Sequence, residues 1–134
     1  MNSRELRIGN YVEVDHVIAE VVAIYNNEHD IAILVLPNKV IKINAEKAVP
    51  VALSIDFLIR HCNFDHNGRH ILGMDHHRYF LRFHKGYILL SDRKDEPIIH
   101  FWDIRHLHQL QNLYHALKGR EIEIVFNNDE TKTK

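Results

Sequence analysis

The longest regular pattern in the sequence is the segment HLHQLQNLYHALKG, residues 106–119, which predicts an α-helix. When the segment is wound at about 100° per residue, its large apolar side chains form one stripe. These side chains are Leu107, Leu110, Leu113, Tyr114 and Leu117. Asp103 is suitably placed to cap the start of the helix, and Gly119 suits the left-handed position after its end. A chain with this segment needs an apolar surface on which the stripe can pack.

The opposite face of this helix lacks the lysines and glutamates that are usual on a face in water. Its side chains are His108, Gln111, Asn112 and His115. We expect this second face to be covered, either by the N-terminal part of the chain, which we favour, or by a binding partner.

The first part of the chain, residues 1–53, reads as short β-strands joined by tight turns. The segments IGNYVEV, AEVVAIYN, IAILVL and KVIKI are rich in β-branched residues, and polar turn residues separate them. Strands of this length and spacing predict a small closed β-barrel of the Tudor or KOW kind. Barrels of this kind bind RNA, DNA or peptides, so the fold alone does not select a function.

The second part, residues 54–126, predicts an antiparallel sheet with two helices. Ser54 is a good N-cap for the segment IDFLIRHC, which places Cys62 on an apolar helix face. The segments HILGMD, RYFLRF, GYILLSD and PIIHFW predict a meander with a hairpin turn at His84–Gly86, and EIEIVF predicts a last strand. Residues 127–134 lack apolar side chains and predict a disordered tail. The fold class that we expect is α+β.

Composition places the protein among soluble cytoplasmic chains. It has 134 residues, of which 46% are hydrophobic and 26% are charged, as in ordinary globular domains. A single cysteine excludes an internal disulfide and suits a reducing compartment. The first ten residues contain no apolar signal segment, and the longest apolar run, residues 31–37, is too short to cross a bilayer. We therefore expect no contact with a membrane.

Three segments, in their order and spacing, resemble a family of small uncharacterised proteins carried by phages, prophages and conjugative elements. They are ELRIGNYVEV near the start, PVALSIDFLIRHCNF in the middle and HQLQNLYHALKGREI near the end, and together they cover roughly half of the chain. The chain departs from the family pattern at Ser54, where threonine is usual, at Ile55, where an acid is usual, and at His115, where phenylalanine is usual. The resemblance implies an accessory protein of a mobile element and brings no catalytic residues.

The sequence contains few of the patterns that enzymes need. There are 12 histidines, but His106, His108 and His115 lack the four-residue spacing with which a helix holds a zinc ion. The DHH triplet at residues 75–77 lacks the aspartate motifs of the phosphoesterases with that signature. No nucleophile elbow and no phosphate-binding loop is present. We expect no catalytic residue, no cofactor and no metal, and keep a cryptic metal-dependent hydrolase as a distant alternative.

One predicted strand carries a basic row that suits nucleic acid. In HHRYFLRFH, residues 76–84, alternate positions place His76, Arg78, Phe80, Arg82 and His84 on one face. Basic groups with an aromatic ring between them can follow a phosphate backbone and stack a base. The competing explanation is an ordinary solvated sheet face, which the formal net charge of −1 favours. Protonation of the histidines near pH 5.5 would take the net charge to about +10, so any binding to anions should depend on pH.

The most economical interpretation is a non-enzymatic accessory protein of a mobile element that binds a host macromolecule. Its partner would be a host protein or ribonucleoprotein, and one concrete form is an inhibitor of a host nuclease or CRISPR effector. We place the partner-binding surface on His108, Gln111, Asn112 and His115. The alternative is an RNA- or DNA-binding module that uses Arg78, Phe80, Arg82 and His84. The sequence leaves the oligomeric state open.

Overall fold

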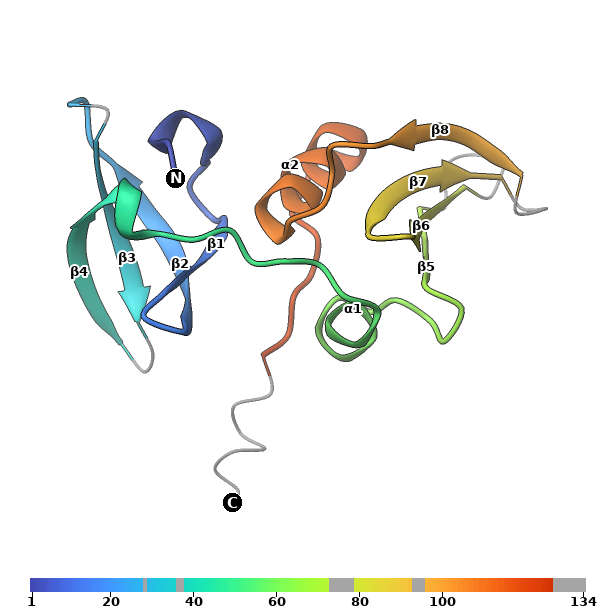
Figure 1. Ribbon diagram of the computed structural model, residues 1–134, viewed down its shortest axis with the longest axis horizontal. Coiled ribbons are helices and arrows are strands. Elements are labelled where there is room, and N and C mark those ends of the chain that lie inside the picture. Colours follow the sequence, from blue (N-terminus) through green and yellow to red (C-terminus); the bar gives the residue numbers. More distant parts are fainter. Residues whose placement is uncertain (28, 36–37, 73–78, 93–95, 127–134) are drawn as a thin grey trace, which may run out of the picture. The chain divides into compact units, whose positions relative to one another are not determined.

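A computed structural model gives the structure of the protein, and it describes residues 1–27, 29–35, 38–72, 79–92 and 96–126. The fold is α+β, with two antiparallel four-stranded sheets and two α-helices (Figure 1). The chain divides into two compact units. Unit 1 contains Met1–Ala52 and His106–Leu113, and unit 2 contains Leu53–Arg105 and the segment from Tyr114 onward. The first part of the second helix, up to Leu113, belongs with unit 1.

The sheet of unit 1 is a simple meander. Strands β1 (Tyr11–Val14), β2 (Val17–Ile24), β3 (Asp30–Val35) and β4 (Lys39–Asn44) lie in chain order, and each is antiparallel to the next. Two short 3-10 helices, η1 (Ser3–Glu5) and η2 (Ala45–Lys47), flank the sheet. Within the described residues β1 does not pair with β4, so the closed barrel expected from the sequence is unconfirmed.

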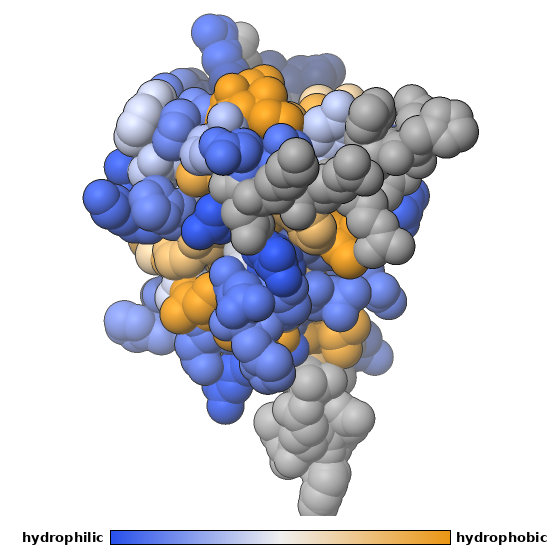
Figure 2. Space-filling model, turned by 90° about the vertical axis from the view of Figure 1, so that its right-hand side faces the viewer, coloured by the Kyte–Doolittle hydropathy of each residue, from blue (hydrophilic) through white to orange (hydrophobic). Residues whose placement is uncertain are grey.

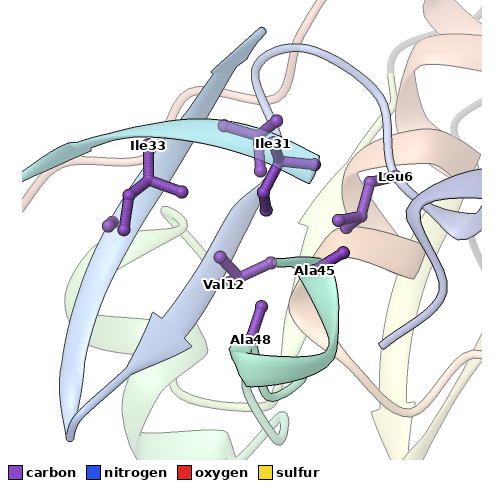
Figure 3. Packing of buried hydrophobic residues seen from close by; sticks show 8 residues of the cluster. Leu6, Val12, Ile31, Ile33, Ala45 and Ala48 are labelled. Carbon is purple, nitrogen blue, oxygen red and sulfur yellow. The ribbon is translucent and has the colours of Figure 1, made fainter. Parts of the chain in front are cut away.

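The core of unit 1 forms where one face of this sheet meets the two 3-10 helices. Figure 3 shows the buried side chains that converge there, which include Leu6, Val12, Ile31, Ile33, Ala45 and Ala48. Successive residues of a strand face opposite sides of the sheet, so Ile31 and Ile33, two residues apart, point the same way. The small side chains of Ala45 and Ala48 let η2 approach the sheet closely. The cluster holds together the strands of unit 1.

Helix α2 (Leu107–Lys118) begins later than the sequence suggested. Asp103 lies in the turn before it and is not the N-cap. Instead, the Gln109 side chain accepts a hydrogen bond from the amide of His106 at 3.0 Å. Gly119 has φ of +72° and donates its amide to the carbonyl of His115 at 2.8 Å, which confirms the expected stop.

Unit 2 contains helix α1 and the second sheet. Helix α1 (Ile55–His61) is capped by Ser54, whose hydroxyl accepts a hydrogen bond from the amide of Phe57. Strands β5 (Arg69–Ile71), β6 (Phe80–His84), β7 (Tyr87–Ser91) and β8 (Pro97–Phe101) form an antiparallel meander (Figure 1). The hairpin between β6 and β7 turns at Lys85 and Gly86, both with positive φ, as the sequence predicted.

Two further expectations concern the packing of unit 2. Cys62 is a core residue as expected, and its burial raises the pKa of the thiol to about 12, so it is not a poised nucleophile. The last predicted strand, residues 121–126, is wrong, because the segment is not a strand. The amide of Val125 donates a hydrogen bond to the carbonyl of His61. Side-chain packing holds the segment instead, with Ile122 buried and Phe126 beside the ring of Phe57.

Candidate nucleic-acid interface

The polar face of α2 is engaged inside unit 1. Gln111 is 2% exposed, and its carboxamide forms hydrogen bonds with backbone groups at the start of β1. Oε1 accepts a hydrogen bond from the amide of Tyr11 at 2.9 Å, and Nε2 donates to the carbonyl of Gly9 at 2.8 Å. The side chain thus satisfies one donor and one acceptor of the backbone.

Asn112 joins a second polar contact of unit 1. Its Oδ1 accepts hydrogen bonds from Nδ2 of Asn10 at 2.9 Å and from Nε of Arg7 at 3.0 Å. Asn10 is fully buried, and its own Oδ1 accepts the amide of Arg7 at 2.7 Å. The sequence interpretation did not single out Asn10 or Arg7, because a polar residue at the start of a strand resembles an ordinary turn.

His108 and Gln111 are buried, as the expected covering of this helix face requires, whereas His115 is exposed and its covering by a partner stays a prediction. The contacts of Gln111 and Asn112 are internal to the unit, as the favoured expectation required. Of the four residues assigned to a partner surface, His115 alone has an exposed side chain. A partner docking on this face would meet little of the predicted set.

Two histidines, the buried His108 and the half-buried His70, have lowered pKa values. For His108 the main cause is burial, with a further contribution from neighbouring His106, and Glu5 partly opposes both. Its Nε2 lies 3.9 Å from a carboxylate oxygen of Glu5, and its Nδ1 has no hydrogen-bond partner among the described residues. For His70 burial again comes first, backbone groups of nearby residues oppose it, and Arg120 adds to the lowering. Both rings are neutral at pH 7.

Acidification is therefore expected to destabilise the protein. Because the folded-state pKa values lie below the ordinary value of 6.5, the unfolded chain binds these two protons more readily. Their contribution to stability is fully present above about pH 6.5 and is lost as the pH falls towards the lowered folded-state values. Thermal unfolding between about pH 8 and pH 5 measures this effect. The variant His108→Gln should show a shallower fall in melting temperature than the parent, and an unchanged slope would contradict the assignment.

The basic row predicted on residues 76–84 is only partly described, since His76 and Arg78 lie outside the described residues. Phe80, Arg82 and His84 do share one face of β6, as alternation requires. Phe80 is 8% exposed, with the Arg69 guanidinium 5.1 Å from the centre of its ring. The ring is thus packed beneath a cation and offers no open face to a base. Arg82 lies directly opposite Arg69 in the register of β5 and β6, which concentrates positive charge on this face.

An aromatic–basic cluster forms farther along the same sheet face, from His84, Tyr87, His100, Trp102 and Arg105. Tyr87 is the buried centre, and the ring of Trp102 lies 4.7 Å from it. His100 stacks on Trp102 at 4.7 Å with an interplanar angle of 10°, and its Nδ1 lies 2.8 Å from the Tyr87 hydroxyl. The Arg105 guanidinium lies 5.7 Å from the Tyr87 ring, and His84 contacts that ring edge-on. Trp102 itself is 59% exposed.

The local fold explains how these side chains meet. In the register of β7 and β8, Leu89 pairs with His100, so these two side chains lie on the same face of the sheet. Tyr87 is two residues before Leu89 on β7 and therefore lies on that face too. A tight turn follows β8, in which the amide of Ile104 donates to the carbonyl of Phe101. The amide of Ile88 then donates to the carbonyl of Ile104, which brings the next residue, Arg105, back over Tyr87.

Sequence reasoning identified His84 in this cluster and missed its other members. Trp102 and Arg105 lie after the strand, where no alternation pattern applies. The available signal was compositional, because Trp102 is the single tryptophan of the chain and stands two residues from a histidine and three from an arginine.

Apolar side chains are also exposed elsewhere. Figure 2 shows separate hydrophobic patches on an otherwise hydrophilic face. In unit 2 the exposed large apolar residues include Ile98 and Ile99 on β8, which is the last strand of its sheet. Among the described residues, no three histidine, cysteine or acidic side chains gather in a way that could hold a metal ion. In that same part of the chain no helix is long and apolar enough to cross a membrane.

Comparison of the chain with protein-family models, with curated proteins and with solved structures gives no match.

Proposed function

We propose that this protein is a non-enzymatic binding protein whose unit 2 holds single-stranded nucleic acid on the aromatic–basic cluster. The observation that carries the proposal is Trp102, an indole that is 59% exposed although it is packed against His100 and Tyr87. A large aromatic ring that is held rigidly and still faces solvent is a surface on which a base can stack. The resemblance to proteins of mobile elements suits this role, because such elements act on nucleoprotein machines. We place the protein in the cytoplasm.

The chemistry around the indole suits a nucleic-acid strand. Arg105 supplies a permanent positive charge beside the aromatic rings, and Arg82 supplies a second on the same sheet face. Stacking on an aromatic ring contributes about 1–3 kcal/mol per base, and arginine contributes by pairing with phosphate. A single strand is favoured over a duplex because only unpaired bases expose their faces to a protein ring.

The single tryptophan provides a direct test of binding. Unlabelled single-stranded RNA and DNA oligonucleotides are expected to quench its fluorescence, and a duplex of the same sequence should quench it less. Replacement of Trp102 by alanine should weaken binding about tenfold or more, measured by anisotropy of a labelled strand, because one stacked base is lost. Trp102→Phe should recover most of the affinity. Arg105→Gln should weaken binding. It should also make the slope of log affinity against log salt concentration shallower by about one, because one phosphate contact is lost.

The matched control is Ile8→Ala, which shortens a similarly exposed apolar side chain in unit 1. It should leave the affinity unchanged. Absence of quenching by both RNA and DNA at low salt and pH 6 would overturn the proposal. So would equal affinity of the parent and Trp102→Ala.

A second candidate is the binding of a host protein, such as a nuclease or CRISPR effector that the protein would inhibit. The observation that favours it is the exposure of Ile98 and Ile99 on the edge strand β8, since exposed strand edges recruit partner strands. A pull-down from host lysate with and without nuclease treatment separates the two candidates. Capture that survives nuclease and is lost in Ile99→Lys supports the protein partner, and capture that nuclease removes supports nucleic acid.

A further inference from the structure

A polar cavity of about 300 Å³ lies within unit 2, apart from the aromatic–basic cluster. One wall is the loop after α1 and the outer edge of β5, which is the first strand of its sheet. The other wall is formed by Tyr114, Arg120 and Glu123, from the end of α2 and the segment that follows it. The volume is sufficient for a small metabolite.

Four charged side chains line this cavity, and two of them neutralise each other. The Asp65 carboxylate accepts the amides of Asn67 and Arg69 and contacts Nε of Arg69 at 3.3 Å. Burial would raise the pKa of Asp65, but these backbone bonds and the Arg69 guanidinium together lower it, so the group is a carboxylate held inside its own turn. Asp65 and Arg69 are therefore already satisfied.

The other two charges have no such partner. Neither Arg120 nor Glu123 forms an ion pair with the other or with another residue in the part of the chain that the structure describes. The Arg120 guanidinium lies 5.8 Å from the centre of the Tyr114 ring, which holds the side chain at the cavity wall. Within the described residues, the cavity thus presents one cation and one anion that form no ion pair.

The remaining polar groups of the wall offer one donor. His70 is a neutral ring between Phe64 and Tyr114, and its Nδ1 is buried, so this nitrogen does not face the cavity. In the ladder of β5 and β6, the amide of Leu72 donates to the carbonyl of Tyr79. By alternation the amide of Ile71 points to the opposite, outer edge, where the cavity lies.

We propose that this cavity binds a small zwitterion with the chemistry of an α-amino acid. Its carboxylate would pair with Arg120 and the Ile71 amide, and its ammonium group would pair with Glu123. Charge complementarity selects this class, because an anion alone would face Glu123 unpaired and a cation alone would face Arg120. The inference is independent of the nucleic-acid proposal.

Calorimetry with glycine, L-serine and L-phenylalanine tests the proposal, with acetate and ethylammonium as ligands that carry one charge each. At least one amino acid should bind with a dissociation constant of about 1 mM or lower, and each half-ligand should bind about tenfold more weakly. Arg120→Gln and Glu123→Gln should each weaken binding about tenfold or more, since each removes a charged hydrogen-bond partner. The reversed pair Arg120→Glu with Glu123→Arg should recover part of the affinity.

Arg105→Gln is the matched control. It should leave amino-acid binding intact while it weakens nucleic-acid binding, and Arg120→Gln should do the reverse, so the two proposals fail separately. Unchanged melting temperatures of the exposed Arg120 and Glu123 variants would show that they fold. Acetate or ethylammonium binding as tightly as the amino acids would overturn the zwitterion assignment. Absence of binding by all three amino acids at about 10 mM would also overturn it.

Discussion

Replacing Gln111 with leucine is expected to lower the free energy of unfolding by about 2–5 kcal/mol, one of the two largest effects that we predict. Leucine has a similar volume but cannot bond, so the Tyr11 amide and the Gly9 carbonyl would both lose their partner. A buried polar group without a partner costs about 1–3 kcal/mol, and two such groups outweigh the gain from a more apolar side chain. Denaturant unfolding followed by circular dichroism measures the change.

The control lies on the same helix. The side chain of His115 is exposed, so His115→Ala should change the free energy of unfolding by no more than about 0.5 kcal/mol. If Gln111→Leu matches His115→Ala, the carboxamide contacts contribute nothing to stability. The polar face of α2 would then be an unoccupied surface, and the assignment of that face to a partner would regain support.

Replacing Leu110 with alanine is expected to cost about 2–5 kcal/mol, because it removes a fully buried side chain from the apolar stripe of α2 and leaves a cavity. The same substitution at Leu117, which is only partly buried, should cost clearly less. The pair holds helix propensity and chemistry constant, so the difference between the two variants reports burial alone. Equal losses would mean that the stripe is buried evenly along the helix, contrary to the structure.

Much of the local structure could be predicted from residue type and spacing. Ser54 caps α1 because its hydroxyl can reach the amide of Phe57, and Lys85–Gly86 turns because glycine tolerates positive φ. Alternation placed Phe80, Arg82 and His84 on one face of β6. Each of these inferences depends on residues that are close in the chain, so geometry over a few bonds decides them.

The predictions that failed are those in which a local pattern competed with tertiary contacts. Residues 121–126 alternate like a strand, but no strand in the described part of the chain pairs with them, and a strand needs a partner for its backbone groups. Asp103 is a suitable cap by type, but the turn after β8 places it before the helix, and Gln109 bonds the His106 amide instead.

The candidate sites show the same division. The sequence by itself determined that α2 has one apolar and one polar face, because side-chain direction follows from helical winding. Only the tertiary structure decided that Gln111 bonds the backbone of Gly9 and Tyr11, a hundred residues away. It also decided that Phe80 is packed under Arg69 while Trp102 stays exposed. Burial depends on which distant segments cover a side chain, and no spacing within a single strand or helix carries that information.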